Sequence, residues 1–289
     1  MASSPMRFYL GCALWGYQGW VGALYPSGSR SSDFLRLYGQ RLSAVEGNST
    51  FYAVPSQRTL ARWASEVPPG FAFCPKLPQA ITHAGRLVPQ LDRARQFIDR
   101  MQALGDRLGP TFAQLPPAYS PQARADLEAF LAQLPGRDVP LAVEVRHPDW
   151  FVEPHASALD GLLQQAGVGR VLLDTRPIYQ RPDDLQVAAE RRKPQLPLQP
   201  SVTAPFSLVR FISHPEPALN QPFWAEWAQR LRDWLQAGTR VYWFMHCPVE
   251  ARSPHHARRF HTTLGAWGAP VPPLPWERCQ APPEQLRLF

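Results

Sequence analysis

Short apolar runs alternate with amphipathic stretches along almost the whole chain. Eight of these runs have the length and the apolar content typical of buried strands. They cover residues 8–14, 43–49, 71–77, 111–115, 141–147, 170–176, 207–213 and 240–247. Strands that alternate with helical segments predict repeated βα units, in which the helices cover a parallel sheet.

Several of the intervening stretches begin with helix-start signals. Ser56 precedes the stretch QRTLARWASEV, and Ser120 precedes Pro121 in SPQARADLEAFLAQL. Serine at the N-cap and proline at the first helical position are both favoured at helix starts. Asp92 opens or precedes a third helix, and a last helix is expected at about 254–266.

Eight strands with intervening helices predict an α/β fold, a single TIM-type (β/α)8 barrel. An open doubly wound sheet is the alternative, but no GxGxxG pattern follows the first strand, which argues against a dinucleotide-binding form. We expect one barrel domain over residues 1–267, with a Pro- and Arg-rich insertion at 181–200 between the sixth and seventh strands. A flexible Pro-rich tail is expected over 268–289.

Composition excludes some classes of protein. With 45% hydrophobic residues the chain can bury a large core, and no apolar run reaches the roughly 20 residues of a membrane helix. The start MASSPMRFYLG lacks the charged beginning and long apolar core of an export signal. We therefore expect a cytoplasmic protein without a membrane partner, whose 4 cysteines, with no CxxC pair, are free thiols.

The charge of the chain is strongly basic. The net charge is +7, and of the 30 basic residues only Lys76 and Lys193 are lysines, so that the other 28 are arginines. A basic balance favours polyanionic partners such as nucleic acid. A general bias of the sequence towards arginine, alanine and proline explains the charge equally well.

Polar residues gather near the C-terminal ends of the predicted strands, where barrel enzymes build their sites. Glu46 and Asn48 are two positions apart in the second strand, so their side chains are expected to share one face. A carboxylate and an amide on an inward face cost free energy without partners, which suggests a site. The other strands contribute Lys76, Gln114, Glu144, Arg146, His147, Asp174, Arg176, Arg210, His214 and His246.

Acids beside Lys and Arg suit an anionic ligand, with one acid as general acid or base. The predicted catalytic residues are Glu46, Glu144 and Asp174. The predicted ligand- or phosphate-binding residues are Asn48, Lys76, His83, Gln114, Arg146 and Arg210. One alternative is a purely structural ion-pair network. Another is a divalent metal held by the histidines and acids, although no HExxH-like pair supports it.

Six segments in this order resemble the YecE-like family, known as domain of unknown function 72. They are GCALWGYQGWVGALYP, VEGNSTFYAVPS, FAFCPKLPQAITH, FAQLPP, VEVRHPDWF and VRFISH. The resemblance extends from about residue 8 to 266; it implies a TIM-type barrel and brings no established activity. By position it picks out Glu46, Asn48, Thr50, Tyr52, Lys76, His83, Gln114, Glu144, Arg146, Trp150, Asp174 and Arg210.

The chain ends in QLRLF, which resembles the pentapeptide by which many bacterial DNA polymerases and repair proteins bind the sliding clamp. After a Pro-rich stretch, Leu286, Leu288 and Phe289 can reach an apolar groove while Gln285 hydrogen-bonds at its edge. The alternatives are a tail that folds back onto the barrel and a chance match.

Three functions fit these features. The first is a DNA-maintenance enzyme that is recruited by the sliding clamp and hydrolyses a phosphodiester or a damaged nucleotide. In it the acids bind a metal or act as base, and Lys76, Arg146 and Arg210 hold phosphate. The second is a metabolic enzyme for a small anionic or sugar-like ligand at the same site. The third is a non-catalytic adaptor that binds the clamp through its tail.

Overall fold

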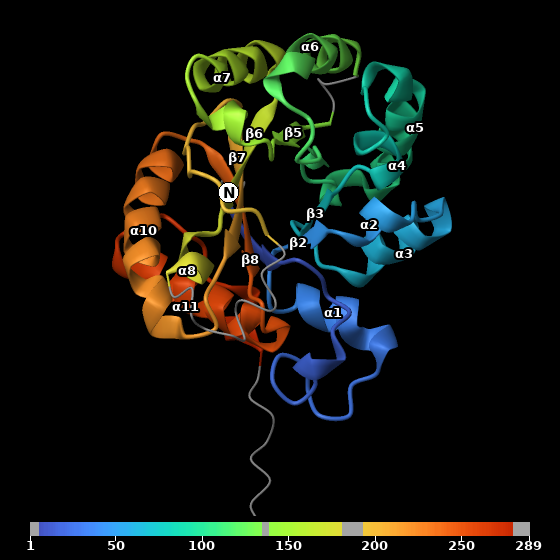
Figure 1. Cartoon of the computed structure of the whole chain (residues 1–289). Coiled ribbons are helices and arrows are strands. Elements are labelled where there is room, and N and C mark those ends of the chain that lie inside the picture. The colour runs from blue at the N-terminus through green and yellow to red at the C-terminus, as the bar shows by residue number, and fades with distance from the viewer. Residues whose placement is uncertain (1–5, 135–138, 181–192, 280–289) are drawn as a thin grey trace, which may run out of the picture.

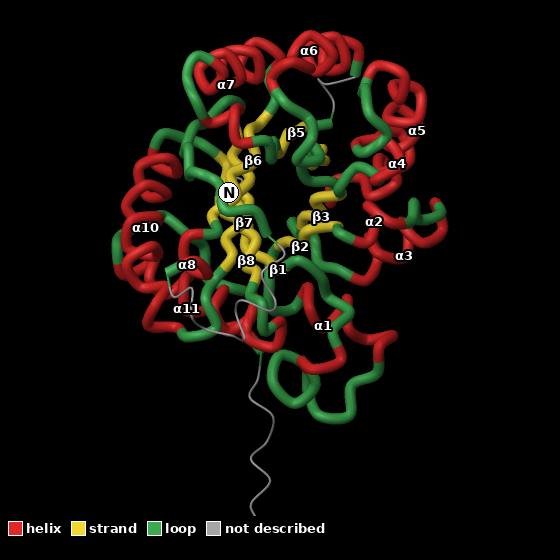
Figure 2. The backbone as a smooth tube through the Cα atoms, in the orientation of Figure 1, coloured by secondary structure: helices red, strands yellow, loops and turns green. Residues whose placement is uncertain are grey.

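The strands form a nearly closed barrel. A computed structural model of the chain describes residues 6–134, 139–180 and 193–279. Its eight parallel strands lie in the order β3-β2-β1-β8-β7-β6-β5-β4, so chain neighbours pair and β8 pairs with β1 (Figure 2). They are β1 (Phe8–Cys12), β2 (Ala44–Gly47), β3 (Ala72–Pro75), β4 (Thr111–Gln114), β5 (Leu141–Glu144), β6 (Gly169–Asp174), β7 (Phe206–Ile212) and β8 (Arg240–His246).

The edges at β3 and β4 meet, which confirms the predicted TIM-type barrel. The amide of Gly109 donates to the carbonyl of Phe73 at 2.7 Å, and that of Leu77 donates to the carbonyl of Phe112 at 2.9 Å. The surrounding helices (Figure 1) are α1 (Phe34–Gly39), α2 (Ser49–Tyr52), α3 (Gln57–Glu66), α4 (Gln79–Thr82), α5 (Leu91–Met101), α6 (Arg124–Gln133), α7 (His155–Ala166), α8 (Arg176–Tyr179), α10 (Gln221–Gln236) and α11 (Ser253–Ala266).

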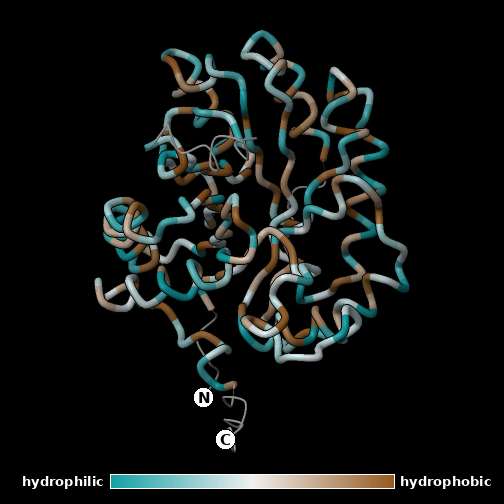
Figure 3. Tube along the Cα trace, turned by 60° about the horizontal axis from the view of Figure 1, so that its bottom comes forward, coloured by the Kyte–Doolittle hydropathy of each residue, from teal (hydrophilic) through white to brown (hydrophobic). Residues whose placement is uncertain are grey.

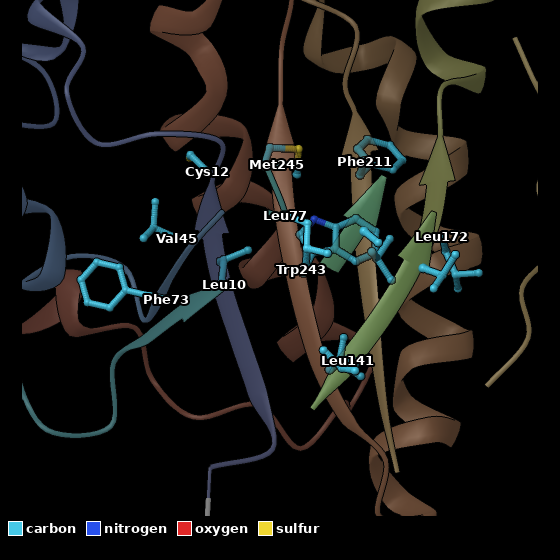
Figure 4. Packing of buried hydrophobic residues seen from close by; sticks show 14 of the residues in the cluster. Leu10, Cys12, Val45, Phe73, Leu77, Leu141, Leu172, Phe211, Trp243 and Met245 are labelled. Atoms are coloured by element: carbon cyan, nitrogen blue, oxygen red, sulfur yellow. The ribbon is translucent and has the colours of Figure 1, made fainter. Parts of the chain in front are cut away.

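Strand side chains alternate between the barrel interior and the helices. Alanines on three strands face larger aromatic side chains on others, which together fill the interior. This inner cluster contains Ala44, Ala72, Cys74, Phe112, Ala142, Val171, Phe206, Leu208, Tyr242 and Phe244. A larger second cluster packs strands against helices, and Figure 4 shows Leu10, Leu172 and Trp243 among its strand residues.

The helix starts follow the predicted signals only in part. The Ser56 hydroxyl accepts from the amide of Thr59 at 3.1 Å and caps α3 as predicted. Ser120 instead precedes a 3-10 turn over Pro121–Ala123, which leads into α6, and its side chain makes no capping bond. In Figure 3 hydrophilic and hydrophobic segments alternate along the outer helices, as amphipathic helices on a barrel require.

The two segments outside the βα repeat contact the barrel in the described part of the chain. The Thr175 hydroxyl donates to the carbonyl of Pro194 at 3.1 Å, which ties the end of the insertion to the C-terminal end of β6. His261 Nε2 lies 2.8 Å from the carbonyl of Pro272, and Leu274 is buried. The packed chain therefore continues past the predicted boundary at residue 267. Residues 181–192 and the tail motif Gln285–Phe289 lie outside the described residues.

Two further expectations concern cysteines and membranes. All 4 cysteines are free, and Cys12, Cys74 and Cys247 are buried. Burial raises the pKa of Cys247 to about 11, so this thiol stays protonated at neutral pH. No helix in the described ranges is both long enough and apolar enough to cross a membrane.

Packing between β8 and the outer helices predicts a large loss of stability for one tryptophan. Trp243 is fully buried and stacks on Phe260 with ring centroids 4.2 Å apart. Trp243→Ala should lower the free energy of unfolding by about 3–5 kcal/mol, because it leaves a cavity in the packed layer. Urea unfolding followed by circular dichroism measures this change.

Trp267 provides the matched control because its residue surface is 42% exposed. Trp267→Ala should change the free energy of unfolding by less than about 0.5 kcal/mol, as for most surface substitutions. Similar losses in the two variants would contradict the assignment of Trp243 to the core.

Candidate functional site

Arg210 on β7 joins two buried carboxylates at the mouth of the barrel. Its Nε and Nη2 donate to Oε2 and Oε1 of Glu46 at 3.0 and 2.9 Å. Its Nη1 donates to Oε2 of Glu144 at 2.5 Å. Each of the three residues is at most 1% exposed. The structure thus brings three predicted site residues together, although Glu46 and Arg210 lie 164 positions apart in the chain.

The charges of this cluster stabilise one another. Burial raises the pKa of Glu144, but Arg210 and then Arg146 outweigh it and lower that pKa to about 2. Burial likewise opposes ionisation of Glu46, and Arg210 and His246 hold its pKa well below the usual range. Both carboxylates are therefore ionised at neutral pH.

Arg146 and His246 complete the hydrogen bonds of the two carboxylates. Arg146 Nε donates to Oε1 of Glu144 at 2.6 Å, and its side chain is 12% exposed, so the cluster reaches solvent there. His246 Nε2 lies 2.8 Å from Oε2 of Glu46. Burial lowers the pKa of His246 to about 4, even though Glu46 favours the charged form. A neutral His246 then donates Nε2–H to Glu46.

Lys76 lies directly after β3 and has no carboxylate partner in the described part of the chain. Its Nζ donates to Oε1 of Gln114 at 2.8 Å and lies 3.8 Å from the centre of the Phe51 ring. The backbone amide of Lys76 donates to the Thr50 hydroxyl at 3.0 Å, and this hydroxyl in turn donates to the backbone carbonyl of Lys76 at 2.6 Å. Burial, followed by the charge of Arg210, lowers the pKa of Lys76 to about 7.

Lys193, at the end of the insertion, is a site residue that sequence reasoning missed. After burial, the charges that act most on its ammonium are those of Arg210, Glu46 and Arg146, which places it beside the cluster. Burial is the main reason that its pKa falls to about 8. The composition could have pointed to Lys193, because Lys76 and Lys193 are the only lysines in the chain.

Glu250 is a second missed residue near the mouth. It begins the 3-10 turn Glu250–Arg252 after β8, and its carbonyl accepts from Trp20 Nε1 at 3.0 Å. Burial raises the pKa of Glu250 to about 7, and the charges of Glu46 and Lys193 also act on it. Sequence reasoning missed Glu250 because it considered polar residues at strand ends, whereas Glu250 lies in a turn.

The surroundings of Asn48 and His83 differ from those that the sequence predicted. The expectation that Asn48 shares a strand face with Glu46 is wrong, because β2 ends at Gly47 and Asn48 has a helical backbone conformation. The side-chain Nδ2 of Asn48 donates to the carbonyl of Ala13 at 3.1 Å. The half-buried His83 ring packs edge-on against Phe51, with ring centroids 5.3 Å apart.

Asp174 is not brought into the cluster. Its Oδ2 accepts from Nε1 of Trp227 on α10 at 2.8 Å, and its carboxylate also accepts from Arg176 Nε and Nη2 at 3.0 and 2.9 Å. The side chain therefore leaves β6 on the helix side of the sheet. Of two further residues picked out by family resemblance, Trp150 is fully buried and donates from Nε1 to the carbonyl of Tyr119 at 2.8 Å, and Tyr52 is 81% exposed, with its ring edge-on to that of Phe51.

Within the described ranges, the acids of the mouth form no group suited to a metal ion. No group of three or more His, Cys, Asp or Glu residues suited to a metal ion occurs in the ranges that the structure describes. The guanidinium of Arg210 lies between the carboxylates of Glu46 and Glu144, where it uses the oxygens that a cation would need. The described donor set therefore does not fit the divalent metal that the sequence left open as an alternative.

Known proteins share both the sequence pattern and the fold. The family model described as "Protein of unknown function DUF72" matches residues 9–279. The UPF0759 protein YecE of Escherichia coli is 35% identical over 249 residues, 85% of this chain and 88% of its own. The UPF0759 protein YunF of Bacillus subtilis is 26% identical over 154 residues, 50% of this chain and 53% of its own.

Two solved structures have the same fold. The crystal structure of a DUF72 family protein of Enterococcus faecalis matches with a TM-score of 0.70 at 17% identity, and covers 89% of this chain and 95% of its own. That of a DUF72 family protein of Thermotoga maritima matches with a TM-score of 0.63 at 21% identity, and covers 90% and 99%. At these identities the likeness concerns the fold alone.

The cluster predicts a pH-dependent defect when its central arginine is removed. Arg210→Met leaves two buried carboxylates without their main partner and should lower the free energy of unfolding by about 3–5 kcal/mol at pH 7. Burial then raises the pKa of Glu46 and Glu144, so acid relieves the defect by protonating them. In the wild type both carboxyl groups have a low pKa, so their ionised forms stabilise the fold at neutral pH. This stabilisation is lost as the pH falls. The deficit should therefore begin to shrink at the raised pKa of the carboxyl groups in the variant, above about pH 4.5, and continue to shrink as the pH falls towards the pKa of about 2 that Glu144 has in the wild type.

Denaturant unfolding between pH 3 and 8 measures this difference. When Arg210→Met is added to the double variant Glu46→Gln and Glu144→Gln, its deficit relative to that double variant should not depend on pH, because neither protein has the two titrating acids. An equal deficit in Arg210→Met at every pH would show that lost packing rather than charge pairing causes it.

Proposed function

The chain belongs to the DUF72 family, and we propose that its barrel mouth binds a small anionic molecule and carries out acid–base chemistry on it. The observation that carries this proposal is the position of the two lysines. Lys76 and Lys193 lie beside a charge cluster whose carboxylates are already engaged by Arg210 and Arg146. Neither ammonium forms a salt bridge with a described acid.

The balance of charge at the mouth favours an anion. Three acids at the mouth, Glu46, Glu144 and Glu250, are outnumbered by four basic side chains, those of Lys76, Arg146, Lys193 and Arg210. With all seven ionised the mouth carries one surplus positive charge, and a second while Glu250 keeps its proton. A carboxylate or phosphate group of a ligand would neutralise this surplus through charge-assisted hydrogen bonds.

The proton-transfer roles differ from those expected for the acids. A general base works best when its pKa is close to the working pH. The pKa of Glu144, about 2, makes this carboxylate a weak base, whereas that of Lys76 is about 7. We assign proton transfer to Lys76, and to Glu46 and Glu144 the role of holding Arg210 and shaping the field around the amine.

Binding of anions provides the test. Inorganic phosphate and oxalate should raise the melting temperature of the protein, whereas a neutral sugar should not, because a ligand that binds the native state stabilises it. Lys193→Met should weaken anion binding about tenfold, a loss of about 1.4 kcal/mol. Isothermal titration calorimetry measures the affinity directly.

Arg62→Met is the matched control for loss of one positive charge. The Arg62 side chain is 67% exposed and pairs with Glu66 on the outer helix α3. This variant should bind anions as the wild type does. No stabilisation by either anion, or the same affinity in Lys193→Met as in the wild type, would contradict the proposal.

DNA maintenance is a second candidate, favoured by a basic groove beside α11. The groove is lined by Glu216, Pro217, Arg252, His255, His256, Arg258, Arg259 and Thr262. Three arginines against one acid in a concave surface suit a phosphate backbone. Recruitment to DNA would use the clamp-like segment Gln285–Phe289.

The clamp interaction has a direct test. The full-length protein should bind the sliding clamp of its host, and a version that lacks Gln285–Phe289 should not, since the apolar side chains of the motif supply the contact. Surface plasmon resonance with immobilised clamp, followed by DNA binding at 50 and 200 mM salt, separates the two interactions.

The control is the double substitution Leu288→Ala and Phe289→Ala, which keeps the length and charge of the tail. Clamp binding that survives both changes would reject the motif. DNA affinity that does not fall with salt would argue against phosphate contacts. Clamp binding without any ligand at the barrel mouth would favour an adaptor that has no catalytic role.

A further inference from the structure

The choice of lysine at the mouth requires an explanation of its own. The chain uses arginine at 28 of its 30 basic positions, and both exceptions lie beside the Glu46–Arg210–Glu144 cluster. Arginine binds carboxylates and phosphates at least as well as lysine does. Near neutral pH, however, only lysine can lose its proton and offer a nitrogen lone pair.

The surroundings of Lys76 suit an amine that must react. Its only described side-chain hydrogen bond goes to the neutral amide oxygen of Gln114, and one side of Nζ faces the Phe51 ring. Its residue surface is 6% exposed. The Thr50 hydroxyl is hydrogen-bonded to both the amide and the carbonyl of Lys76, so the backbone from which the side chain starts is fixed.

Two arginines near Lys76 disfavour its charged form. The charges of Arg210 and Arg146 lower the pKa of Lys76, while those of Glu144 and Glu46 raise it. Because each of these carboxylates is also engaged by an arginine, their attraction for the ammonium is offset. A desolvated lysine beside other cations is a known way to prepare an amine nucleophile.

We propose that Lys76 forms an imine with the carbonyl carbon of an anionic aldehyde or ketone, whose carboxylate or phosphate is held by Arg146 and Lys193. This inference rests on the anion-binding function proposed above and specifies the class of its ligand. The ligand would combine a reactive carbonyl group with an acidic group a few bonds away.

The reaction at Lys76 balances without an added reagent. The neutral Nζ attacks the carbonyl carbon, a C–N bond forms, and the carbonyl oxygen takes a proton as the nitrogen gives one up. The resulting carbinolamine then loses its hydroxyl group with one proton as water. Amine and carbonyl compound thus become imine and water, and protonation of the imine nitrogen produces an iminium ion.

Neighbouring side chains can serve each stage of this reaction. The iminium ion retains one N–H, which can donate to Gln114 as the free amine does. His83 packs on the same Phe51 ring as Lys76 and is partly exposed. The iminium withdraws electrons from the adjacent carbon, which assists proton removal or carbon–carbon cleavage there.

Lys193 is suited to binding rather than to the covalent step. It lies on the end of the insertion rather than on a strand of the barrel, and it is less deeply buried than Lys76. It contributes charge for the acidic group of the ligand. The two lysines should therefore respond differently to the same experiment.

Reductive trapping on the full-length chain tests the proposal. The protein is incubated with pyruvate or glycolaldehyde phosphate and reduced with sodium borohydride, which converts an imine into a stable secondary amine. Peptide mass spectrometry then locates the adduct, and only Lys76, Lys193 and the N-terminal amine can carry it. We expect at least tenfold more adduct on Lys76 than on either other amine with one or both probes.

Three variants and one ligand control complete the design. Lys76→Arg and Lys76→Met should lose the adduct, and circular dichroism shows whether each variant is folded. Lys193→Arg should keep the adduct on Lys76, because it preserves the charge that binds the ligand. Lactate, which has the acidic group of pyruvate but no carbonyl group, should bind without being trapped.

The outcomes separate this inference from the function on which it rests. Anion binding without selective trapping on Lys76 by either probe would overturn the imine and leave the proposed function intact. Absence of anion binding would overturn both. Equal adducts on all three amines would also reject the inference, because they would show unselective chemistry. Trapping that rises with pH to half its maximum near pH 7 would support the assignment to Lys76.

Discussion

The ion pairs of Arg210 with Glu46 and Glu144 are the constraint on which the barrel mouth depends. They connect β7 with β2 and β5, none of which are neighbours in the sheet, and all three side chains are excluded from water. Separate burial of any one of these charges would cost several kcal/mol. The members of the cluster therefore keep one another ionised, and their charges shift the pKa values of the neighbouring side chains Lys76, Lys193 and His246.

That field reverses the roles which the residue types alone suggest. The carboxylates have a low pKa and accept hydrogen bonds from Arg210, Arg146 and His246, which leaves them weakly basic. The same arginines, together with burial, lower the pKa of Lys76 to about 7. Both lysines thus titrate near neutral pH, as does Glu250, while Glu46 and Glu144 maintain the conditions under which the amines can react.

Most of the fold could be predicted from the sequence, and part of the site. All eight strands appear where the apolar runs placed them, and Glu46, Lys76, Gln114, Glu144, Arg146 and Arg210 do meet at the mouth. The expectation that Asn48 shares a strand face with Glu46 is wrong because β2 ends one residue before Asn48, which breaks the alternation of faces. Asp174 lies on the other face of its strand, since a single position separates the inner side from the outer one.

The sequence by itself determined the barrel, because the periodicity of apolar residues is a local property that decides which segments become strands and helices. Only the tertiary structure decided which polar side chains face one another and which protonation states they adopt. Those properties depend on burial and on contacts such as that between Glu46 and Arg210, 164 residues apart. Lys193 is the clearest case, because nothing local to its Pro-rich segment indicates that its ammonium lies beside a cluster built from three distant strands.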